Sequence, residues 1–471
     1  MKKKRLLVTI SFSFSIRYLI RTKLIEKLRT FCDPVIAIYW NEEDLISELR
    51  ANGFEVVLIP PAETSIRYND CRKKINYWFN YHNLRNNSRL IDSYMERRLA
   101  INNRLKKRLR GQFNVVKYSF FLSEEKLFQN ERKMLQTETN FSFYLDWLLQ
   151  LNIDAVFTVT PFHKQEDLLL RAAKGLGLKM IASILSFDNT TKRGWMPVIY
   201  DQYLVWNEQN KRELLYLYSD LKPENICITG AAQFDFYFDP ANRMSREEWK
   251  SVNNIPSTDR PILFYSGGAA DLFPQEIQYV QDLIDAVKSE KIADRPLILF
   301  RSHPADSVMK WKTAFHNSAD IILQNSWGGG KQYLYSNLTD FDIVNLCSTL
   351  AYTDVHISLC STMTVDGSAF DKPQLAPYYD RIRRKDQKSL RGLFEQLHYK
   401  KIMESGGLTL VRKPEDWRAA INQSLHNPKR EVSERNRILL EIISFTDGKS
   451  TQRVAESIQH FLISEIETAV F

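Results

Sequence analysis

The chain has 471 residues, of which 65 are Lys or Arg and 56 are Asp or Glu, so its formal net charge is +9. Hydrophobic residues make up 44% and charged residues 26%, which is typical of a folded protein and excludes a disordered chain. The length predicts two or three domains. Residues 67–110 hold thirteen Lys or Arg and three Asp or Glu. The excess charge therefore belongs to this one segment, where an anionic partner is expected.

The N-terminal sequence predicts a first β-strand rather than a signal peptide, because serines and Arg17 interrupt its apolar run. No apolar run approaches the roughly 20 residues of a membrane span. The cysteines are odd in number and form no CxxC pair, so they predict neither a zinc site nor a disulfide framework. We expect a protein of the reducing cytoplasm, free or peripheral at the inner face of the membrane.

Short apolar runs alternate with longer amphipathic stretches, which is typical of βα units and parallel sheets. Strands are predicted, in chain order, at residues 6–10, 35–39, 56–59, 155–159, 180–185, 203–206, 226–229, 262–265, 297–300, 321–323 and 355–359. Long basic helices are predicted over residues 62–135, as an insertion between strands. The turn-rich segment 238–259 predicts a domain boundary, after which the βα pattern restarts. Near the end, Val454, Ile458, Phe461 and Leu462 form the apolar stripe of a helix.

These patterns predict an α/β fold of the GT-B type, with two Rossmann-like parallel-sheet domains facing a cleft. The expected limits are 1–240 for an acceptor domain, 258–440 for a nucleotide-donor domain and 441–471 for a closing helical segment. In open α/β sheets, ligands bind beyond the carboxyl ends of the strands. Residues that directly follow a strand are therefore the main candidates for function.

Three motifs follow strands of the second domain. Their candidate residues for donor binding are Ser266, Gly267 and Gly268; Arg301, His303 and Pro304; and Ser361, Thr362 and Asp366. The glycine turn can present backbone N–H groups to a phosphate, although tight turns also use glycine for conformation alone. Arg301 and His303 suit an anionic or nucleotide ligand. Hydroxyls at a helix start can bind a phosphate or simply cap the helix.

In the first domain the candidate general base is Asp188, which follows a predicted strand. An Asx-turn is the competing interpretation of the same residue. Lys192 and Arg193 follow closely and are candidates for contact with the acceptor. Glu166 and Asp167, which come after the strand at 155–159, are the reserve candidates for the base.

Two patterns that mimic known motifs are better explained by structure. Asp340-Phe341-Asp342 resembles a metal-binding DxD, but it precedes an amphipathic stretch and predicts a capped helix start. The sequence around Lys449 resembles the end of a P-loop, but Ile443 stands where the first glycine should be and no strand is predicted before it. We therefore expect neither a metal nor a cofactor.

The motifs together resemble those of a known superfamily. His303-Pro304 resembles the HP motif of GT-B enzymes that use cytidine-nucleotide donors: bacterial sialyltransferases, polysialyltransferases, Kdo transferases and CDP-glycerol glycerophosphotransferases. Ser361-Thr362 resembles their SS/ST motif, and residues 353–373 are similar to the glycerophosphotransferase pattern around it. Residues 203–235 resemble the segment that closes the first domain. The resemblance covers about residues 150–375.

The resemblance implies that His303 contacts the donor nucleotide or its phosphate, and that Ser361 and Thr362 bind that phosphate. The glycerophosphotransferases have a His-Gly pair where this chain has Phe187-Asp188, which favours a sugar transferase with an acidic base. The implied activity is inverting, metal-independent transfer of a sialic acid or Kdo-like sugar from a nucleotide donor, preferably CMP-linked. The acceptor would be a glycan or glycolipid in the synthesis of surface polysaccharide, such as capsule or lipopolysaccharide.

Three alternatives stay open. One is a CDP-glycerol-type glycerophosphotransferase, and another is a UDP-sugar 2-epimerase, although the usual epimerase motifs are not found. The third is a binding protein that acts through residues 67–110. Aromatic residues alternate there with Arg and Lys: Tyr68, Tyr77, Trp78, Phe79, Tyr81 and Tyr94. Such a segment suits an anionic membrane surface or, less favoured here, nucleic acid. Packing of these aromatic residues on the core is the competing interpretation.

Overall fold

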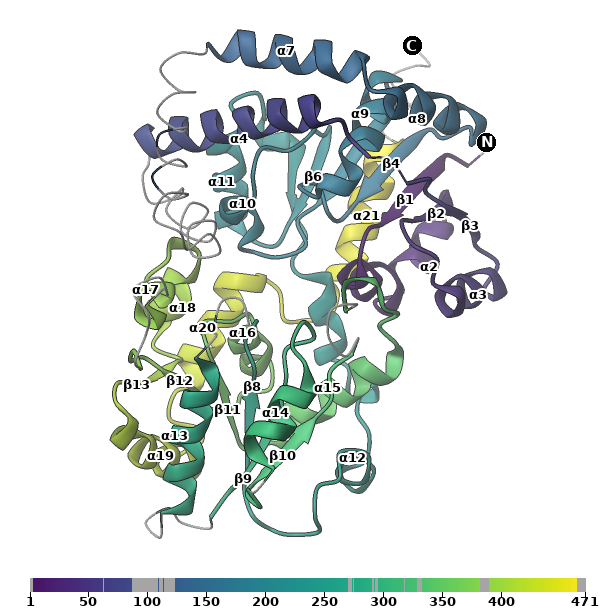
Figure 1. Ribbon diagram of the computed structural model, residues 1–471. Helices are drawn as coiled ribbons and strands as arrows, with labels where there is room; N and C mark the ends of the chain where they lie inside the picture. Colours follow the sequence, from purple (N-terminus) through teal and green to yellow (C-terminus); the bar gives the residue numbers. More distant parts are fainter. Residues whose placement is uncertain are drawn as a thin grey trace. The chain divides into compact units, whose positions relative to one another are not determined.

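The computed structural model describes residues 3–463 apart from several gaps. These gaps are residues 62, 87–108, 110–112, 114–122, 270–272, 274, 290–291, 293–294, 317, 328–332 and 382–388. The chain divides into two compact units (Figure 1). Unit 1 consists of Met1–Ala232 together with Ser450–Phe471, and unit 2 consists of Gln233–Lys449.

Unit 1 is built on a seven-stranded parallel sheet of order β3-β2-β1-β4-β5-β6-β7. The strands are β1 Arg5–Ile10, β2 Asp33–Ile38, β3 Glu55–Leu58, β4 Ala155–Thr158, β5 Lys179–Ser183, β6 Gln202–Val205 and β7 Ile226–Ile228. The helices are α1 Ser13–Ile16, the π-helix η1 Arg17–Arg21, α2 Leu24–Arg29, α3 Glu43–Ala51, α4 Ile66–Asn86, α7 Glu124–Gln136, α8 Thr139–Gln150, η2 Lys164–Glu166, α9 Asp167–Gly175, α10 Asn189–Lys192, α11 Glu208–Leu217, η3 Pro223–Asn225 and α21 Ser450–Ile463.

Unit 2 is built on a six-stranded parallel sheet of order β10-β9-β8-β11-β12-β13. The strands are β8 Ile262–Ser266, β9 Leu297–Arg301, β10 Ile321–Gln324, β11 Val355–Ser358, β12 Gln374–Pro377 and β13 Thr409–Val411. The helices are η4 Ala232–Tyr237, η5 Pro240–Asn242, α12 Arg246–Val252, α13 Glu276–Lys288, α14 Val308–Phe315, η6 Tyr333–Tyr335, α15 Asp340–Tyr352, α16 Met363–Ser368, α17 Leu390–Phe394, η7 Leu397–Tyr399, α18 Lys400–Ser405, η8 Pro414–Asp416, α19 Trp417–His426 and α20 Val432–Ile443.

All eleven strands predicted from the sequence are strands of the two sheets. The central residues of the inner strands are buried, as expected for parallel strands that are covered on both faces, whereas those of the edge strands β3, β7 and β10 are half-buried. The sequence analysis missed β12 and β13. Both are short, and β12 follows Pro373 and ends at Pro377, so its sequence is not typical of a strand.

The helical insertion is confirmed where the structure describes it, by α4 and α7. Its remaining part, including Tyr94, lies outside the described residues. The predicted helix start near residue 340 is also confirmed. Thr339 accepts a hydrogen bond from the backbone N–H of Asp342, and the Asp342 carboxylate accepts one from the backbone N–H of Thr339. This capping box explains the acidic pair without a metal.

The segment expected to link the domains, residues 238–259, belongs to unit 2. Trp249 of α12 is fully buried there and donates a hydrogen bond from Nε1 to Thr349 of α15 at 3.0 Å. The division of the chain falls instead between Ala232 and Gln233. Residues 441–471 are also divided, because α20 belongs to unit 2 and α21 to unit 1.

Helix α21 brings the end of the chain into the core of unit 1. Its Val454, Ile458 and Leu462 are buried in the same hydrophobic cluster as residues of β1, β2 and α2. The side chain of Gln202 in β6 donates to the carbonyl oxygen and hydroxyl of Ser457 at 3.3 and 3.0 Å. The predicted apolar stripe therefore forms the buried face of this helix.

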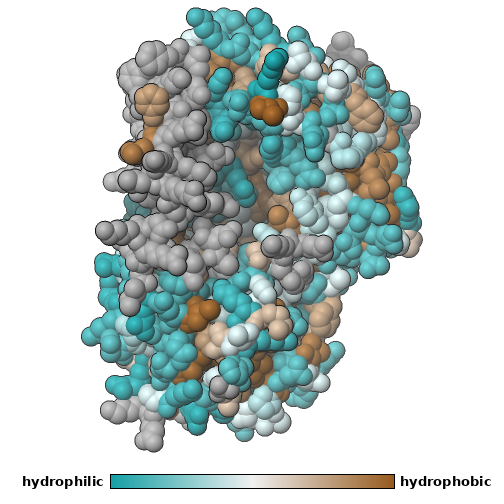
Figure 2. Space-filling model, in the orientation of Figure 1, coloured by the Kyte–Doolittle hydropathy of each residue, from teal (hydrophilic) through white to brown (hydrophobic). Residues whose placement is uncertain are grey.

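In the view of Figure 2, the described surface is mainly hydrophilic, with smaller hydrophobic areas between the hydrophilic ones. Within the part of the chain that the structure describes, no helix is long and apolar enough to cross a membrane.

The buried face of α21 can be tested by comparing two isoleucines of this helix. Replacing Ile458, which is fully buried, by Ala leaves a cavity and should lower the free energy of unfolding by about 2–5 kcal/mol. Ile463→Ala is the control, because this side chain is 43% exposed and its truncation should cost much less. The measurement is urea unfolding followed by circular dichroism. Equal losses for the two variants would contradict the assignment of the core face.

Candidate functional site

The donor-site candidates of unit 2 lie at the carboxyl ends of three neighbouring strands. In the sheet, β8 lies between β9 and β11, and Ser266 at the end of β8 is paired with Ser358 at the end of β11. The chain runs from β8 through β9 to β10 on one side and then crosses to β11 on the other side of β8, so the topological switch point lies between β8 and β11. The residues that follow these strands therefore meet where α/β sheets commonly bind ligands.

The glycine turn after β8 is held by hydrogen bonds within unit 2. The backbone N–H of Gly267 donates to the carbonyl oxygen of Arg301 at 2.8 Å, and that of Gly268 donates to the Glu276 carboxylate at 2.8 Å. A Cβ on Gly267 would lie 3.2 Å from the backbone nitrogen of His303. Both N–H groups that we expected to be available for a phosphate are thus engaged, and the glycines instead allow the ends of β8 and β9 to approach closely.

Arg301 and Asp366 are buried and bound within unit 2, which differs from the roles that the sequence predicts for them. Arg301 is 6% exposed and donates to the side-chain oxygen of Gln324 at 3.2 Å. Asp366 is 3% exposed and accepts a hydrogen bond from the hydroxyl of Tyr237. Each residue thus has a buried hydrogen-bond partner within unit 2, and its assignment as a donor contact stays a prediction.

His303 is oriented by its own backbone turn. Its Nδ1 accepts a hydrogen bond from the backbone N–H of Ala305 at 3.0 Å, so in the neutral ring the hydrogen is on Nε2, which can donate. Burial lowers the pKa of His303, against the opposing effect of Asp306. Pro304 follows directly and ends the extended segment. The adjacent Ser302 was missed by the sequence analysis; its hydroxyl is buried and has no hydrogen-bond partner among the described residues.

Ser361 and Thr362 lie between β11 and α16. Thr362 is exposed, and Ser361 is half-buried with its hydroxyl oxygen accepting from the backbone N–H of Met363 at 3.2 Å. Tyr399 donates to the carbonyl oxygen of Ser361 at 3.1 Å, which fixes this turn against η7. His303, Ser361 and Thr362 are thus donor-site candidates that are at least partly exposed.

In unit 1, Glu166 lies at the switch point between β1 and β4. It is fully buried, and its carboxyl group accepts hydrogen bonds from four hydroxyls that belong to Thr9, Ser11, Thr158 and Thr160. Burial raises the pKa of Glu166 to about 7, although the hydroxyls lower it. Four hydroxyls thus enclose the Glu166 carboxyl group, and its role as a reserve base stays a prediction.

Asp167 belongs to a buried ion cluster that joins three helices of unit 1. Its carboxylate pairs with Arg72 of α4 at 3.0 Å and with Arg171 of α9 at 3.0 Å, and it accepts a bond from the hydroxyl of Tyr68. Glu131 of α7 pairs with the same two arginines at 2.7 and 2.6 Å. The neighbouring guanidinium groups lower the pKa of Asp167, against the effect of its burial. Asp167 is thus a partner of arginines and a poor proton acceptor.

Asp188 precedes α10 and is the remaining candidate base. Its carboxylate forms an ion pair with Lys192 at 2.9 Å, and the side chains of the two residues are 17% and 21% exposed. Arg193 ends the same short helix. The sequence predicts these three residues as neighbours, and the structure brings them together on one segment after β5.

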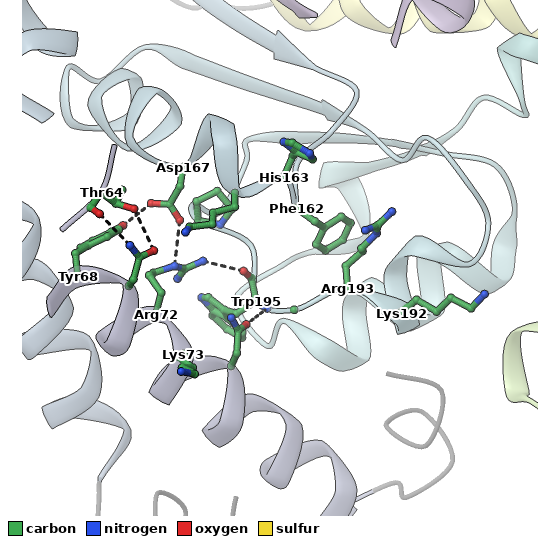
Figure 3. A pocket seen from close by; sticks show the side chains of 15 residues that line it. Thr64, Tyr68, Arg72, Lys73, Phe162, His163, Asp167, Lys192, Arg193 and Trp195 are labelled. Atoms are coloured by element: carbon green, nitrogen blue, oxygen red, sulfur yellow. Dashed lines mark hydrogen bonds and ion pairs between the residues drawn. The ribbon is translucent and has the colours of Figure 1, made fainter. Parts of the chain in front are cut away.

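A cavity of about 500 Å³ lies beside this segment, within unit 1 (Figure 3). Its lining residues come from α4 and the segment before it, from the segment after β4, and from the segment after β5: Thr64, Tyr68, Asn69, Arg72, Lys73, Asn76, Phe162, His163, Lys164, Asp167, Lys192, Arg193, Gly194, Trp195 and Pro197. Arg72 connects two of these walls by donating to the carbonyl oxygen of Trp195 at 2.9 Å. The cavity therefore combines predicted acceptor residues with a wall supplied by the helical insertion.

His163 was missed by the sequence analysis. It follows β4 and lines the cavity, and its Nδ1 is buried with no hydrogen-bond partner among the described residues. Burial lowers its pKa to about 4, and the charge of Arg193 adds to this effect. The ring is therefore neutral near pH 7 and can form a hydrogen bond with a ligand. The sequence did contain one signal for this site, which is that His163 closely follows the apolar run at residues 155–159.

Three aromatic residues of the basic segment pack within unit 1. Tyr68 and Phe79 are buried, and the ring of Trp78 contacts those of Phe128 and Trp195 with centroids 5.7 and 6.1 Å apart. The alternative of a nucleic-acid surface needs such rings to be exposed to bases. For these three residues, packing on the core is the interpretation that the structure supports.

Among the described residues, no three or more His, Cys, Asp or Glu side chains gather in a way that could hold a metal ion.

Comparison with known proteins identifies the fold. No protein-family model matches the chain, and no curated protein sequence matches it. Solved structures match over nearly its full length. A putative UDP-N-acetylglucosamine 2-epimerase from Listeria monocytogenes has 10% identity and a TM-score of 0.56, with 98% of this chain and 97% of that chain covered. A glycosyltransferase from Rickettsia africae has 12% identity and a TM-score of 0.52, covering 98% and 99%. The UDP-GlcNAc 2-epimerase from Neisseria meningitidis, solved bound to UDP-GlcNAc, has 8% identity and a TM-score of 0.52, covering 97% and 99%.

The chain has the GT-B fold. These similarities span both units and agree with the two parallel sheets, so the predicted fold class is confirmed. At such low identity the likeness shows the fold alone.

The raised pKa of Glu166 gives a prediction about stability. Between pH 4.5 and about 7 the folded state binds this proton more tightly than the unfolded state, so stability decreases as the pH rises through this range. The full effect is about 3 kcal/mol, at roughly 1.4 kcal/mol per pH unit. The Glu166→Gln variant should lose this dependence, as measured by urea unfolding at a series of pH values. Glu55→Gln, at an exposed position, should keep it. An unchanged profile for Glu166→Gln would contradict the assignment.

Proposed function

We propose that the protein is an inverting glycosyltransferase that moves a sugar from a nucleotide donor to an acceptor hydroxyl. The observation that carries this proposal is the position of His303 and of the Ser361 and Thr362 hydroxyls at the carboxyl ends of β9 and β11, on the two sides of β8 in a GT-B fold. The resemblance to cytidine-nucleotide enzymes rests on the same residues. It favours a CMP-linked sialic acid or Kdo-like sugar, with a glycan or glycolipid acceptor of surface polysaccharide.

Unit 2 is proposed to hold the donor. The Nε2–H of His303 would donate to a phosphate oxygen, since Nδ1 is already occupied by the Ala305 N–H. The exposed Thr362 hydroxyl and the half-buried Ser361 hydroxyl would donate to the same phosphate. Donors aimed at developing charge contribute about 3–4 kcal/mol each in measured enzymes. They would stabilise the leaving nucleotide, and the proposal includes no metal or cofactor.

Unit 1 is proposed to hold the acceptor, with Asp188 as the base. The acceptor oxygen attacks the anomeric carbon on the face opposite the phosphate, its proton passes to the Asp188 carboxylate, and the bond from that carbon to the phosphate oxygen breaks. The electron pair leaves with the nucleotide, and the configuration at the anomeric carbon inverts. The ion pair to Lys192, which lines the cavity, links Asp188 to the proposed acceptor site.

A UDP-sugar 2-epimerase is the second candidate, since four of the similar solved structures are named as UDP-GlcNAc 2-epimerases. An epimerase acts on its nucleotide sugar alone, whereas a transferase also needs an acceptor site. The cavity of unit 1 therefore favours transfer. Incubation with UDP-GlcNAc, followed by NMR, distinguishes the two, because an epimerase converts the sugar without acceptor. A glycerophosphotransferase would instead consume CDP-glycerol when that compound replaces UDP-GlcNAc in the same NMR assay.

Replacing His303 by Ala tests the donor site. Loss of a hydrogen bond to a charged phosphate, worth about 1.5–3 kcal/mol, should weaken nucleotide binding by roughly 10–150-fold. The measurement is calorimetric titration with whichever of CMP, CDP, UDP and GDP stabilises the wild type most in a thermal-shift panel. His316→Ala is the matched control, since this histidine is exposed at the end of α14. Unchanged affinity in His303→Ala would overturn the donor-site assignment.

Replacing Asp188 by Asn tests the base. The turnover should fall by about 10²–10⁴-fold while nucleotide affinity stays the same, because Asn cannot take the proton. Turnover is measured as nucleotide release from the sugar donor in the presence of acceptor glycans. Asp220→Asn, at an exposed position of unit 1, is the control. Near-normal turnover in Asp188→Asn would remove Asp188 as the base.

A further inference from the structure

The cavity of unit 1 has an excess of positive charge. Five of its lining residues are Lys or Arg, and one, Asp167, is acidic. Arg72 is occupied by Asp167 and Glu131, so it acts mainly as part of the wall. Lys73 and Lys164 are exposed. The ion pair of Lys73 with Asp70 is long, at 3.9 Å, and both of these side chains are more than half exposed. These two lysines are therefore positioned to meet an anionic group of a ligand.

The other cations of the cavity strengthen this charge. Lys192 pairs with Asp188, and Arg193 lies beside it and beside His163. The five lining cations and Arg171 together carry six positive charges. The carboxylates that pair with them, at positions 70, 131, 167 and 188, carry four negative charges, so an excess of two positive charges remains. Within a cavity such a charge attracts anions more strongly than on an open surface, because fewer water molecules screen it.

The apolar part of the cavity is rigid. The ring of Trp195 is fixed by Phe79, Phe128 and Tyr218, with centroids 5.2, 5.5 and 4.7 Å away. Its backbone N–H donates to the side-chain oxygen of Asn76 at 2.8 Å. Aromatic walls of this kind, combined with a few polar groups, are typical of sites for small organic ligands.

Asn76 of α4 helps to hold this wall in place. A Cβ on Gly194 would lie 2.3 Å from the side-chain oxygen of Asn76, so a larger residue here would displace the side chain that accepts the Trp195 N–H. His163, from the opposite wall, contributes a buried Nδ1 that has no partner among the described residues. A buried polar atom of this kind is stabilised when a ligand hydroxyl or an ordered water binds to it.

We propose that this cavity binds an acidic sugar, with a carboxylate or phosphate group held by Lys73 and Lys164, the ring against the aromatic wall and a hydroxyl at His163. The inference rests on the proposed function in one respect, which is that the bound sugar is the acceptor. The chemical class of that acceptor would be an anionic saccharide. Helix α4 of the helical insertion would form one wall of its binding site.

The test is calorimetric titration of the full chain with glucose 1-phosphate, glucuronate and glucose at millimolar concentrations. At least one acidic sugar should bind, glucose should bind much more weakly, and added salt should reduce the binding. The Lys73→Gln/Lys164→Gln double variant should bind the acidic sugar roughly tenfold more weakly, as expected when two exposed charge contacts are lost. Lys133→Gln, at an exposed position of α7 outside the cavity, is the matched control.

Each outcome is decisive. A preference for glucose 1-phosphate or for glucuronate identifies the anionic group. Equal binding of glucose, absence of binding by both acidic sugars, or an equal loss in the control variant would overturn the inference. The nucleotide panel separates this failure from that of the proposed function: nucleotide binding without acidic-sugar binding rejects the acidic acceptor alone, whereas acidic-sugar binding without nucleotide binding rejects the transferase.

Discussion

The acceptor side of unit 1 depends on two guanidinium groups shared between two carboxylates. Arg72 of α4 and Arg171 of α9 both contact Asp167 and Glu131, so helices α4 and α7 of the insertion are tied to α9 through buried charges. Removing one member would leave an uncompensated buried charge, which typically costs about 3–5 kcal/mol. Because Arg72 also binds the carbonyl oxygen of Trp195, the same cluster fixes the segment that carries the proposed acceptor residues.

In unit 2, backbone groups provide the rigidity and side chains provide the ligand contacts. The glycine turn after β8 uses its N–H groups for Arg301 and Glu276 and thereby positions the segment that carries His303. This distribution of roles differs from a phosphate-binding glycine loop, in which the backbone itself meets the ligand. The leaving phosphate would then be met by an imidazole and two hydroxyls.

The sequence predicted the architecture well because burial of parallel strands leaves a strong apolar pattern, and because capping at Thr339 is encoded by residues three positions apart. It could not show which polar side chains already have partners. Asp366 is bound by Tyr237, from a distant part of the sequence, and no local pattern reveals such a pair. The cavity was missed for the same reason, since α4 meets the segment around Trp195 only in the folded chain. The basic character of both segments was the only signal available.

The return of α21 to unit 1 has a consequence for how the protein is made. A ribosome synthesises all of unit 2 before it reaches the helix that contributes Val454, Ile458 and Leu462 to the core of unit 1. Until then the apolar residues around β1, β2 and α2 lack part of their cover, and such surface is prone to aggregation in nascent chains. Unit 1 is therefore translated first but is completed last, only after all of unit 2 has been synthesised.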